Sequence, residues 1–166
     1  MDWLKYFFGF VLLVFLQIVL LNRIHFWGYA TPLLYIYFIL KLPVGMKEVS
    51  VLFIAASIGL IIDFFNYTLG LNMLACTIIG FCQPYFVCKL FSPRDATDSF
   101  VPSLKTLGFL RFAGYAALLT LIHHLALFAV ESFSFLDITV LLIRIGSSFI
   151  FTLALILLVD LIFLKK

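Results

Sequence analysis

Long apolar runs separated by short polar connections constrain this chain more than any other feature of its sequence. A transmembrane helix needs about 20 predominantly apolar residues, so 166 residues leave room for five or six such helices and little else. Apolar residues make up 65% of the chain and charged residues 11%, against about 45–50% and 25% in a soluble domain. We therefore expect an all-α integral membrane protein that forms a single transmembrane domain over residues 1–166.

The same composition excludes several classes of function. No segment is long and polar enough to fold as a soluble catalytic domain, a ligand-binding ectodomain or a nucleic-acid module. The net charge of +3 is small, and we expect no nucleic-acid partner. The three cysteines form no CxxC pair and no Cys/His ligand cluster, so we expect no metal, no other cofactor and no disulfide framework. Function must come from the intramembrane surface and the short loops.

Apolar runs bounded by charge, proline or glycine predict six membrane spans. They are residues 4–21, 32–42, 49–65, 71–90, 107–130 and 136–164. The second is short and lies between Pro32 and Pro43, so it is either a short tilted helix or a re-entrant segment. The longest polar stretch, about residues 92–106, is predicted to be a cytoplasmic loop, either an ordinary solvated connection or a contact for a partner.

Lysine and arginine predict the orientation of the chain in the membrane. If all six segments cross from a cytoplasmic N-terminus, the inner regions hold Lys5, Lys41, Lys47, Lys89, Arg94, Lys105, Arg111, Lys165 and Lys166. The outer loops then hold Arg23, and Arg144 lies within the last span. Because cytoplasmic loops carry the excess of basic residues, we expect six spans with both termini in the cytoplasm.

Ionisable side chains inside predicted spans are the best candidates for a functional site, because inserting each costs at least about 2.5 kcal/mol. They are Asp63, His123 with His124, Arg144 and Asp160. Positions along the helices place the first three groups in the outer half of the membrane. We expect an ion pair between Asp63 and Arg144, with the histidines nearby, that holds spans three, five and six together. The alternatives for this cluster are a proton relay or substrate site, and a surface that binds a partner.

Neighbouring residues support a packing role for this cluster. Asp63 shares a helix face with Asn66 and Gly59, and small residues on a face indicate close contact with protein. Arg144 begins a four-spaced polar stripe that continues through Ser148 and Thr152. Asp160 is separate from the cluster, near the cytoplasmic face, where Lys165 or Lys166 can reach it.

These groups do not match a known catalytic arrangement. An intramembrane aspartyl protease needs two carboxylates that share a proton, but Asp63 and Asp160 are predicted on opposite sides of the membrane. A metalloprotease helix needs histidines at i and i+4 with glutamate between, whereas His123 and His124 are adjacent. We therefore expect no enzymatic activity.

Small residues four positions apart recur in three predicted spans. The pairs are Ala55 with Gly59, Cys76 with Gly80, and Ala113 with Ala117, and the fourth span adds a polar line of Asn72, Cys76, Gly80 and Gln83. Such faces pack helices within one bundle. They also permit a homodimer or contact with another membrane protein.

The stretch from residue 59 to 85, GLIIDFFNYTLGLNMLACTIIGFCQPY, resembles the Gly, Asp and later Leu-Gly pattern of the rod shape-determining MreD family, especially its Bacteroidetes branch. Span one with Gln17, PLLYIYFILKLP from residue 32 to 43 and LIHHLALFAVESF from residue 121 to 133 are similar to that family in order and spacing. By this resemblance Gly59, Asp63 and Gly70 are the motif residues. Asn72 and Gln83 stand where close relatives are expected to carry His and Arg.

The resemblance implies a non-enzymatic subunit of the cell-elongation and peptidoglycan-synthesis machinery in the bacterial inner membrane. Such proteins associate with MreC, a single-span protein, and through it with the MreB cytoskeleton and the RodA glycosyltransferase with its penicillin-binding transpeptidase. The family fold is described as similar to the substrate-binding subunits of energy-coupling-factor transporters, which implies a six-helix bundle with a short second span. A vitamin-binding subunit of such a transporter is the alternative function, because it would share this length and an aromatic-rich outer cavity.

Overall fold

The computed structural model describes residues 9, 14–17, 19, 31–68, 70–88, 100–131 and 138–164. These residues form the helices α2 (Ile36–Leu40), α3 (Glu48–Asn66), α4 (Leu71–Phe86), α5 (Leu104–Leu107), α6 (Phe109–Glu131) and α7 (Ile138–Leu164). None of the described residues lies in a β-strand, so the predicted all-α class is confirmed for this part of the chain. Most of the predicted first span, residues 4–21, lies outside it.

Three helices, α3, α6 and α7, are long and apolar enough to cross a membrane, and α4 is a shorter apolar helix. The predicted spans 49–65, 107–130 and 136–164 agree with these three helices to within about two residues at each end. Helices of this length and composition support the predicted membrane protein.

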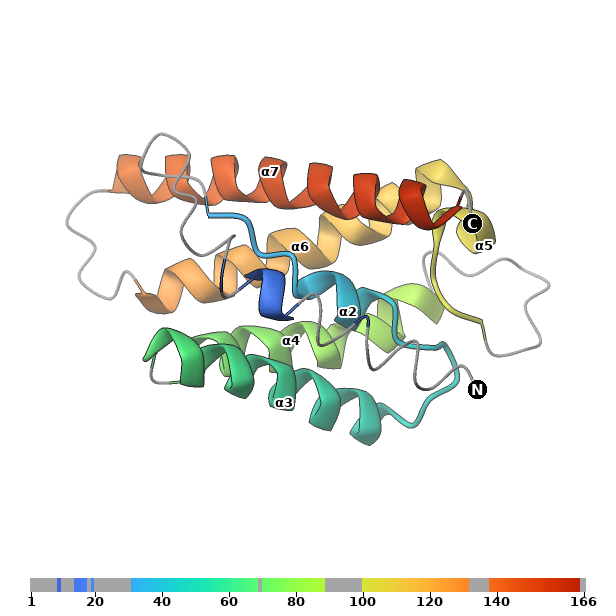
Figure 1. Cartoon of the computed structure of the whole chain (residues 1–166), viewed down its shortest axis with the longest axis horizontal. Helices are drawn as coiled ribbons and strands as arrows, with labels where there is room; N and C mark the ends of the chain where they lie inside the picture. The colour runs from blue at the N-terminus through green and yellow to red at the C-terminus, as the bar shows by residue number, and fades with distance from the viewer. Residues whose placement is uncertain are drawn as a thin grey trace.

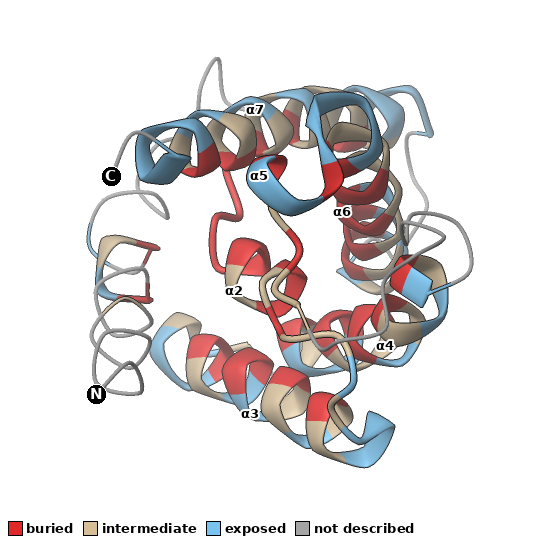
Figure 2. Cartoon of the chain, turned by 90° about the vertical axis from the view of Figure 1, so that its right-hand side faces the viewer, coloured by how far each residue is buried: buried red, intermediate tan, exposed pale blue. Residues whose placement is uncertain are grey.

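The four longer helices lie side by side along the molecule, and α2 lies among them (Figure 1). Figure 2, a view turned by 90°, shows the buried ribbon of α2 surrounded by α3, α4, α6 and α7. Two ends of this bundle recur below. The Lys41 end is where α3 and α6 begin and α7 ends, and the Arg144 end is where α3 and α6 end and α7 begins.

The predicted second span is helical only over the five residues of α2, and residues 31–35 before it are not helical. Residues 32–37 are nevertheless buried, as are Ile39, Leu40 and Leu42. The segment contacts α7 at Ser148 near its start and at Asp160 near its end. Those two α7 residues are about 18 Å apart at the rise of an α-helix, so the segment runs beside α7 through the bundle interior.

Glycine permits the close packing of α3 on α4. A Cβ atom on Gly59 would lie 2.5 Å from the carbonyl oxygen of Asn72, and one on Gly80 would lie 2.5 Å from the Cβ of Ala55. Ala55 and Cys76 are fully buried. Two of the three predicted pairs of small residues therefore pack inside the bundle, between these neighbouring helices.

The end of the predicted loop at residues 92–106 folds back onto the bundle as α5. Ser103 and Thr106 form a capping box at the start of this helix, and Leu104 and Leu107 are buried. Residues 89–99, which include most of the predicted loop, lie outside the described part of the chain.

Candidate functional site

Asp63 caps the helix that follows its own. The carboxylate is 3% exposed, and its Oδ1 accepts hydrogen bonds from the Thr68 hydroxyl and from the backbone and side-chain nitrogens of Asn72, at 3.0 and 2.8 Å. Its Oδ2 accepts a bond from the backbone nitrogen of Met73 at 2.8 Å. The first amides of a helix have no intrahelical acceptor, and a negative charge there is stabilised by the helix dipole. Asp63 supplies both acceptor and charge to α4.

The motif residues Gly59, Asp63 and Gly70 together shape the α3–α4 hairpin. Gly59 lets α4 approach α3, and Gly70, with a φ of +78°, supplies the left-handed conformation directly before α4. Tyr67, directly after α3, also has a positive φ of 55°. The Asp63 carboxylate and Gly70 thus shape the turn, and Gly59 permits the close contact of α3 with α4 beside it, which gives the spacing of the three residues a structural reason.

The predicted ion pair between Asp63 and Arg144 is wrong. Arg144 donates from Nη2 to Glu131 Oε1 at 3.0 Å, and its guanidinium lies 4.9 Å from the centre of the Phe128 ring. The Asp63 carboxylate is satisfied within the α3–α4 turn, while Glu131, at the end of α6, lies where α6 and α7 meet. A local acceptor on the neighbouring helix therefore replaces the predicted partner.

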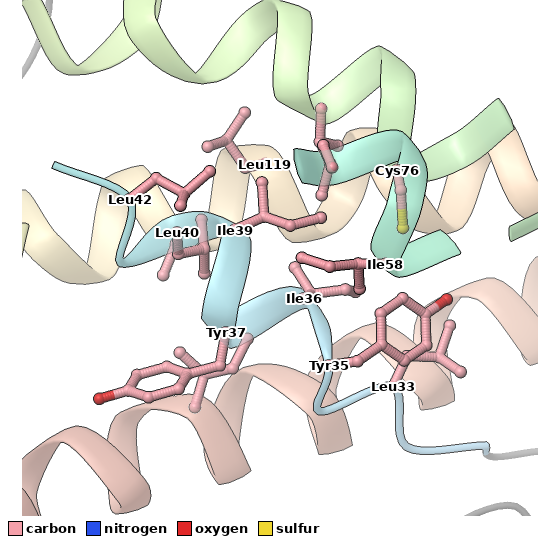
Figure 3. Close-up of a cluster of buried hydrophobic side chains, with 14 of the residues drawn as sticks. Leu33, Tyr35, Ile36, Tyr37, Ile39, Leu40, Leu42, Ile58, Cys76 and Leu119 are labelled. Carbon is pink, nitrogen blue, oxygen red and sulfur yellow. The ribbon is translucent and has the colours of Figure 1, made fainter. Parts of the chain in front are cut away.

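A buried network links Asp63 to His123 through two intermediates, Asn72 and Tyr35. Asn72, held by Asp63, accepts a hydrogen bond at Oδ1 from the Tyr35 hydroxyl at 2.7 Å. The same hydroxyl lies 3.2 Å from His123 Nε2, and the Cys76 sulfur lies 3.8 Å from that nitrogen. The network therefore joins α3, α4 and α6 around Tyr35. In the buried hydrophobic cluster of Figure 3, the side chains of Tyr35 and Tyr37 point in opposite directions.

His124 faces a different helix from its neighbour. Its Nδ1 lies 2.8 Å from the carbonyl oxygen of Thr120, and its Nε2 lies 3.4 Å from the Thr152 hydroxyl on α7. Among the described residues, His123 Nδ1 and Thr120 Oγ1 are buried atoms without a hydrogen-bond partner. The two adjacent histidines thus connect α6 to the core on one side and to α7 on the other.

Side chains satisfy the backbone of the non-helical segment before α2. Gln17 Nε2 donates to the Pro32 carbonyl and its Oε1 accepts from the Leu34 nitrogen, both at 2.8 Å. The Leu33 nitrogen donates to Thr152 Oγ1 and the Thr31 nitrogen to Ser148 Oγ, both at 3.0 Å. Irregular backbone at membrane depth is tolerated only where protein supplies such partners. Two members of the predicted polar stripe on α7, Ser148 and Thr152, therefore bond this segment, whereas Arg144 bonds Glu131.

Gln83 has a similar task at the other end of α2. Its Nε2 donates to the carbonyl oxygen of Leu42 at 3.2 Å, and the Tyr115 hydroxyl donates to that of Leu40 at 3.0 Å. The last carbonyls of a helix lack intrahelical donors. The predicted polar line on the fourth span is buried along its length, as Asn72, Cys76, Gly80 and Gln83 all face the interior.

A second ionic site lies at the Lys41 end, where sequence reasoning singled out Asp160 but missed its partner Lys41. Asp160 is 2% exposed and accepts hydrogen bonds from Lys41 Nζ at 2.6 Å, the Tyr37 hydroxyl at 2.8 Å and the Leu104 nitrogen at 2.7 Å. The predicted partners Lys165 and Lys166 lie outside the described residues, and among the described residues Lys41 is the lysine that contacts Asp160. The one signal in the sequence was a lysine and an aspartate that each interrupt an apolar run.

A cavity of about 290 Å³ opens at the Arg144 end. Its apolar lining comes from Leu33, Leu71, Leu127 and Phe128, and its polar lining from Thr31, Asn66, Thr68, Asn72, Glu131 and Arg144. The cavity thus brings Asn66 and Asn72 to the same space as Arg144, although Asp63 itself is not part of the lining.

Among the described residues, no group of three His, Cys, Asp or Glu side chains is arranged to hold a metal ion. Comparison of the chain with protein-family models, with curated proteins and with solved structures gives no match.

Proposed function

We propose that this chain is a non-enzymatic scaffold subunit of the bacterial cell-elongation complex, with six spans in the inner membrane and both termini in the cytoplasm. The observation that carries the proposal is the shared structural role of Gly59, Asp63 and Gly70, the residues on which the resemblance to the MreD family rests. They close and tighten the α3–α4 hairpin. A motif that maintains a helix hairpin suits a protein that works by presenting helix faces to partners.

The distribution of charge supports the proposed orientation. Four basic residues lie at the Lys41 end, where α3 and α6 begin, or in the segments that lead into that end. They are Lys41, Lys47, Lys105 and Arg111. Cytoplasmic ends of membrane bundles carry the excess of lysine and arginine. The Lys41 end therefore faces the cytoplasm in this proposal, and the Arg144 end faces the periplasm.

External helix faces offer the contact area that membrane partners need. Phe53, Leu60 and Phe64 share one exposed face of α3, and α7 exposes apolar side chains along most of its length. In the proposed complex an MreC-like single-span helix and a RodA-type glycosyltransferase, with its penicillin-binding transpeptidase, pack on such faces. The MreB cytoskeleton is reached indirectly, and a second copy of the chain is a further candidate partner.

The test is to identify what co-purifies with the tagged chain from its native host in a mild detergent. MreC-like and RodA-like proteins are expected. The variant Phe53→Ala/Phe64→Ala should lose one of them if the α3 face is a contact, while the paired change Leu158→Ala/Leu161→Ala tests the α7 face. A pair of ATPases with a coupling membrane subunit would overturn the proposal.

The cavity at the Arg144 end favours a second candidate, a small-molecule-binding subunit of an energy-coupling-factor-type transporter. Ligand sites are concave, largely apolar spaces with a few convergent polar groups, and this cavity has that character. Its volume of about 290 Å³ is at the low end of the range of about 300–1,000 Å³ for such sites. Recovery of the ATPase pair, together with vitamin uptake that depends on the chain, would establish this candidate.

A further inference from the structure

The cavity at the Arg144 end has a chemical character that the scaffold function does not explain. Four residues of its lining, Leu33, Asn72, Leu127 and Phe128, are buried in the bundle. Glu131 and Arg144 are 40% and 30% exposed, so the ion pair lies toward its opening. A buried apolar wall and a charged entrance suit a molecule with one apolar and one ionic part.

The ion pair at this entrance retains unused binding capacity. A guanidinium has five N–H donors and a carboxylate has about four acceptor positions. Within the described residues, the contact between them is one bond from Arg144 Nη2 to Glu131 Oε1 at 3.0 Å. The guanidinium carbon of Arg144 also lies over the Phe128 ring, 4.9 Å from its centre.

Arg144 lies inside α7, while its partner Glu131 is the last residue of α6. Arg144 is six residues after the first residue of α7, which corresponds to about 9 Å along the helix axis. The pair is neutral as a unit, so a ligand with net charge would leave one charge of the three without a partner. Among the described residues, the cavity lining carries one positive and one negative side chain, Arg144 and Glu131. A ligand that carries both charges compensates both.

We propose that this cavity binds a small zwitterion, whose oxyanion lies against Arg144 and whose ammonium group lies against Glu131. Asn66 and Thr68 line the same space, and Leu127 and Phe128 receive the apolar part of the ligand. The inference does not depend on the scaffold function. A zwitterionic ligand of this kind has two sources. One is the headgroup of phosphatidylethanolamine in the bilayer, and the other is a free zwitterion such as an amino acid.

Native mass spectrometry of the full chain, purified in dodecyl maltoside and titrated with single lipids, tests the lipid source. Phosphatidylethanolamine should bind in preference to phosphatidylglycerol, which carries a net negative charge. Glu131→Gln and Arg144→Gln should each weaken its binding about tenfold, the loss of one charge-assisted contact. Glu48→Gln and Arg111→Gln, exposed residues at the opposite end, should leave binding unchanged.

Calorimetric titration of the same preparation with glycerophosphoethanolamine and with leucine tests the free source. Binding of either, with the same dependence on Glu131 and Arg144, supports the proposal with a soluble ligand. Equal binding of phosphatidylglycerol and phosphatidylethanolamine would overturn it, as would unchanged binding in both charge variants. Failure of all the zwitterionic probes to bind would also overturn it.

A variant that fills the cavity separates a loss of ligand binding from a loss of folding. Leu71 lines the cavity and is partly exposed, so Leu71→Trp narrows the space while both charges remain in place. Zwitterion binding should fall at least about tenfold in this variant, with the thermal unfolding temperature of the chain maintained. Full binding in a folded Leu71→Trp protein would place the ligand elsewhere and would overturn the proposal.

Discussion

The ammonium group of Lys41 lies 2.6 Å from the carboxylate of Asp160, although 119 positions separate the two residues in the chain. The same carboxylate accepts bonds from the Tyr37 hydroxyl and the Leu104 nitrogen. One buried side chain of α7 therefore holds the end of α2 and the start of α5. Lys41 also lies over the rings of Tyr37 and Phe112, at 5.5 and 5.6 Å from their centres.

Removing the Asp160 charge should destabilise the protein strongly. Asp160→Asn leaves the largely buried Lys41 ammonium without its counter-ion, and breaking one partner of a buried pair costs about 3–5 kcal/mol. Thermal unfolding in detergent measures the effect. The double variant Asp160→Asn/Lys41→Met should recover part of the loss because no charge is left unpaired. Glu131→Gln, in the partly exposed pair with Arg144, should cost less than about 1 kcal/mol. Equal losses at both pairs would contradict the assignment.

Asp63 should behave as a helix cap and not as the counter-ion of Arg144. Asp63→Ala removes the acceptor for the backbone nitrogens of Asn72 and Met73, so we expect a loss of about 1–3 kcal/mol in the free energy of unfolding. Asp63→Asn keeps one acceptor oxygen and should cost less. The exchange Asp63→Arg/Arg144→Asp should not restore the stability lost in Asp63→Arg. Rescue by this exchange would show that the two residues pair in the folded protein.

A side chain at Gly59 should disturb the α3–α4 contact. In Gly59→Ala the new Cβ would lie 2.5 Å from the Asn72 carbonyl oxygen, so the helices must separate, and overpacking of this kind costs about 1–3 kcal/mol. Gly146→Ala is the matched control on α7, because a Cβ there meets nothing within 4 Å. The control should be neutral or stabilise by up to about 1 kcal/mol through helix propensity. Chemical unfolding compares the two, and a tolerated Gly59→Ala would refute the close approach.

The Thr152 hydroxyl should stabilise the non-helical segment before α2. Thr152→Val removes the acceptor of the buried Leu33 nitrogen and the contact with His124, which should cost about 1–3 kcal/mol. Thr77→Val is the control, because the Thr77 hydroxyl bonds the Met73 carbonyl of its own helix, and we expect a change within about 0.5 kcal/mol. Hydrogen exchange at the Leu33 amide should accelerate in the first variant alone. Unchanged protection there would mean that Thr152 does not hold this backbone.

The local pattern of apolar and polar residues was sufficient to predict where the longer helices begin and end. The bounds of α3, α6 and α7 follow from apolar runs and from the charges, prolines and glycines that interrupt them. The polar residues inside these runs, Asp63 and the two histidines among them, were also visible as candidates. A transmembrane helix of about 20 residues makes its backbone hydrogen bonds within its own segment. A short stretch of sequence therefore determines where it begins and ends.

Tertiary structure alone decided which of these groups meet. Asp63 bonds backbone amides of α4 and does not pair with Arg144. Asp160 pairs with Lys41, which lies 119 positions earlier in the chain. Gln17 and Thr152 accept hydrogen bonds from the backbone of a segment that is helical over only five residues. Such contacts depend on the rotation and depth of each helix in the bundle, which are set by the packing of all its neighbours at once. No short stretch of sequence contains that information.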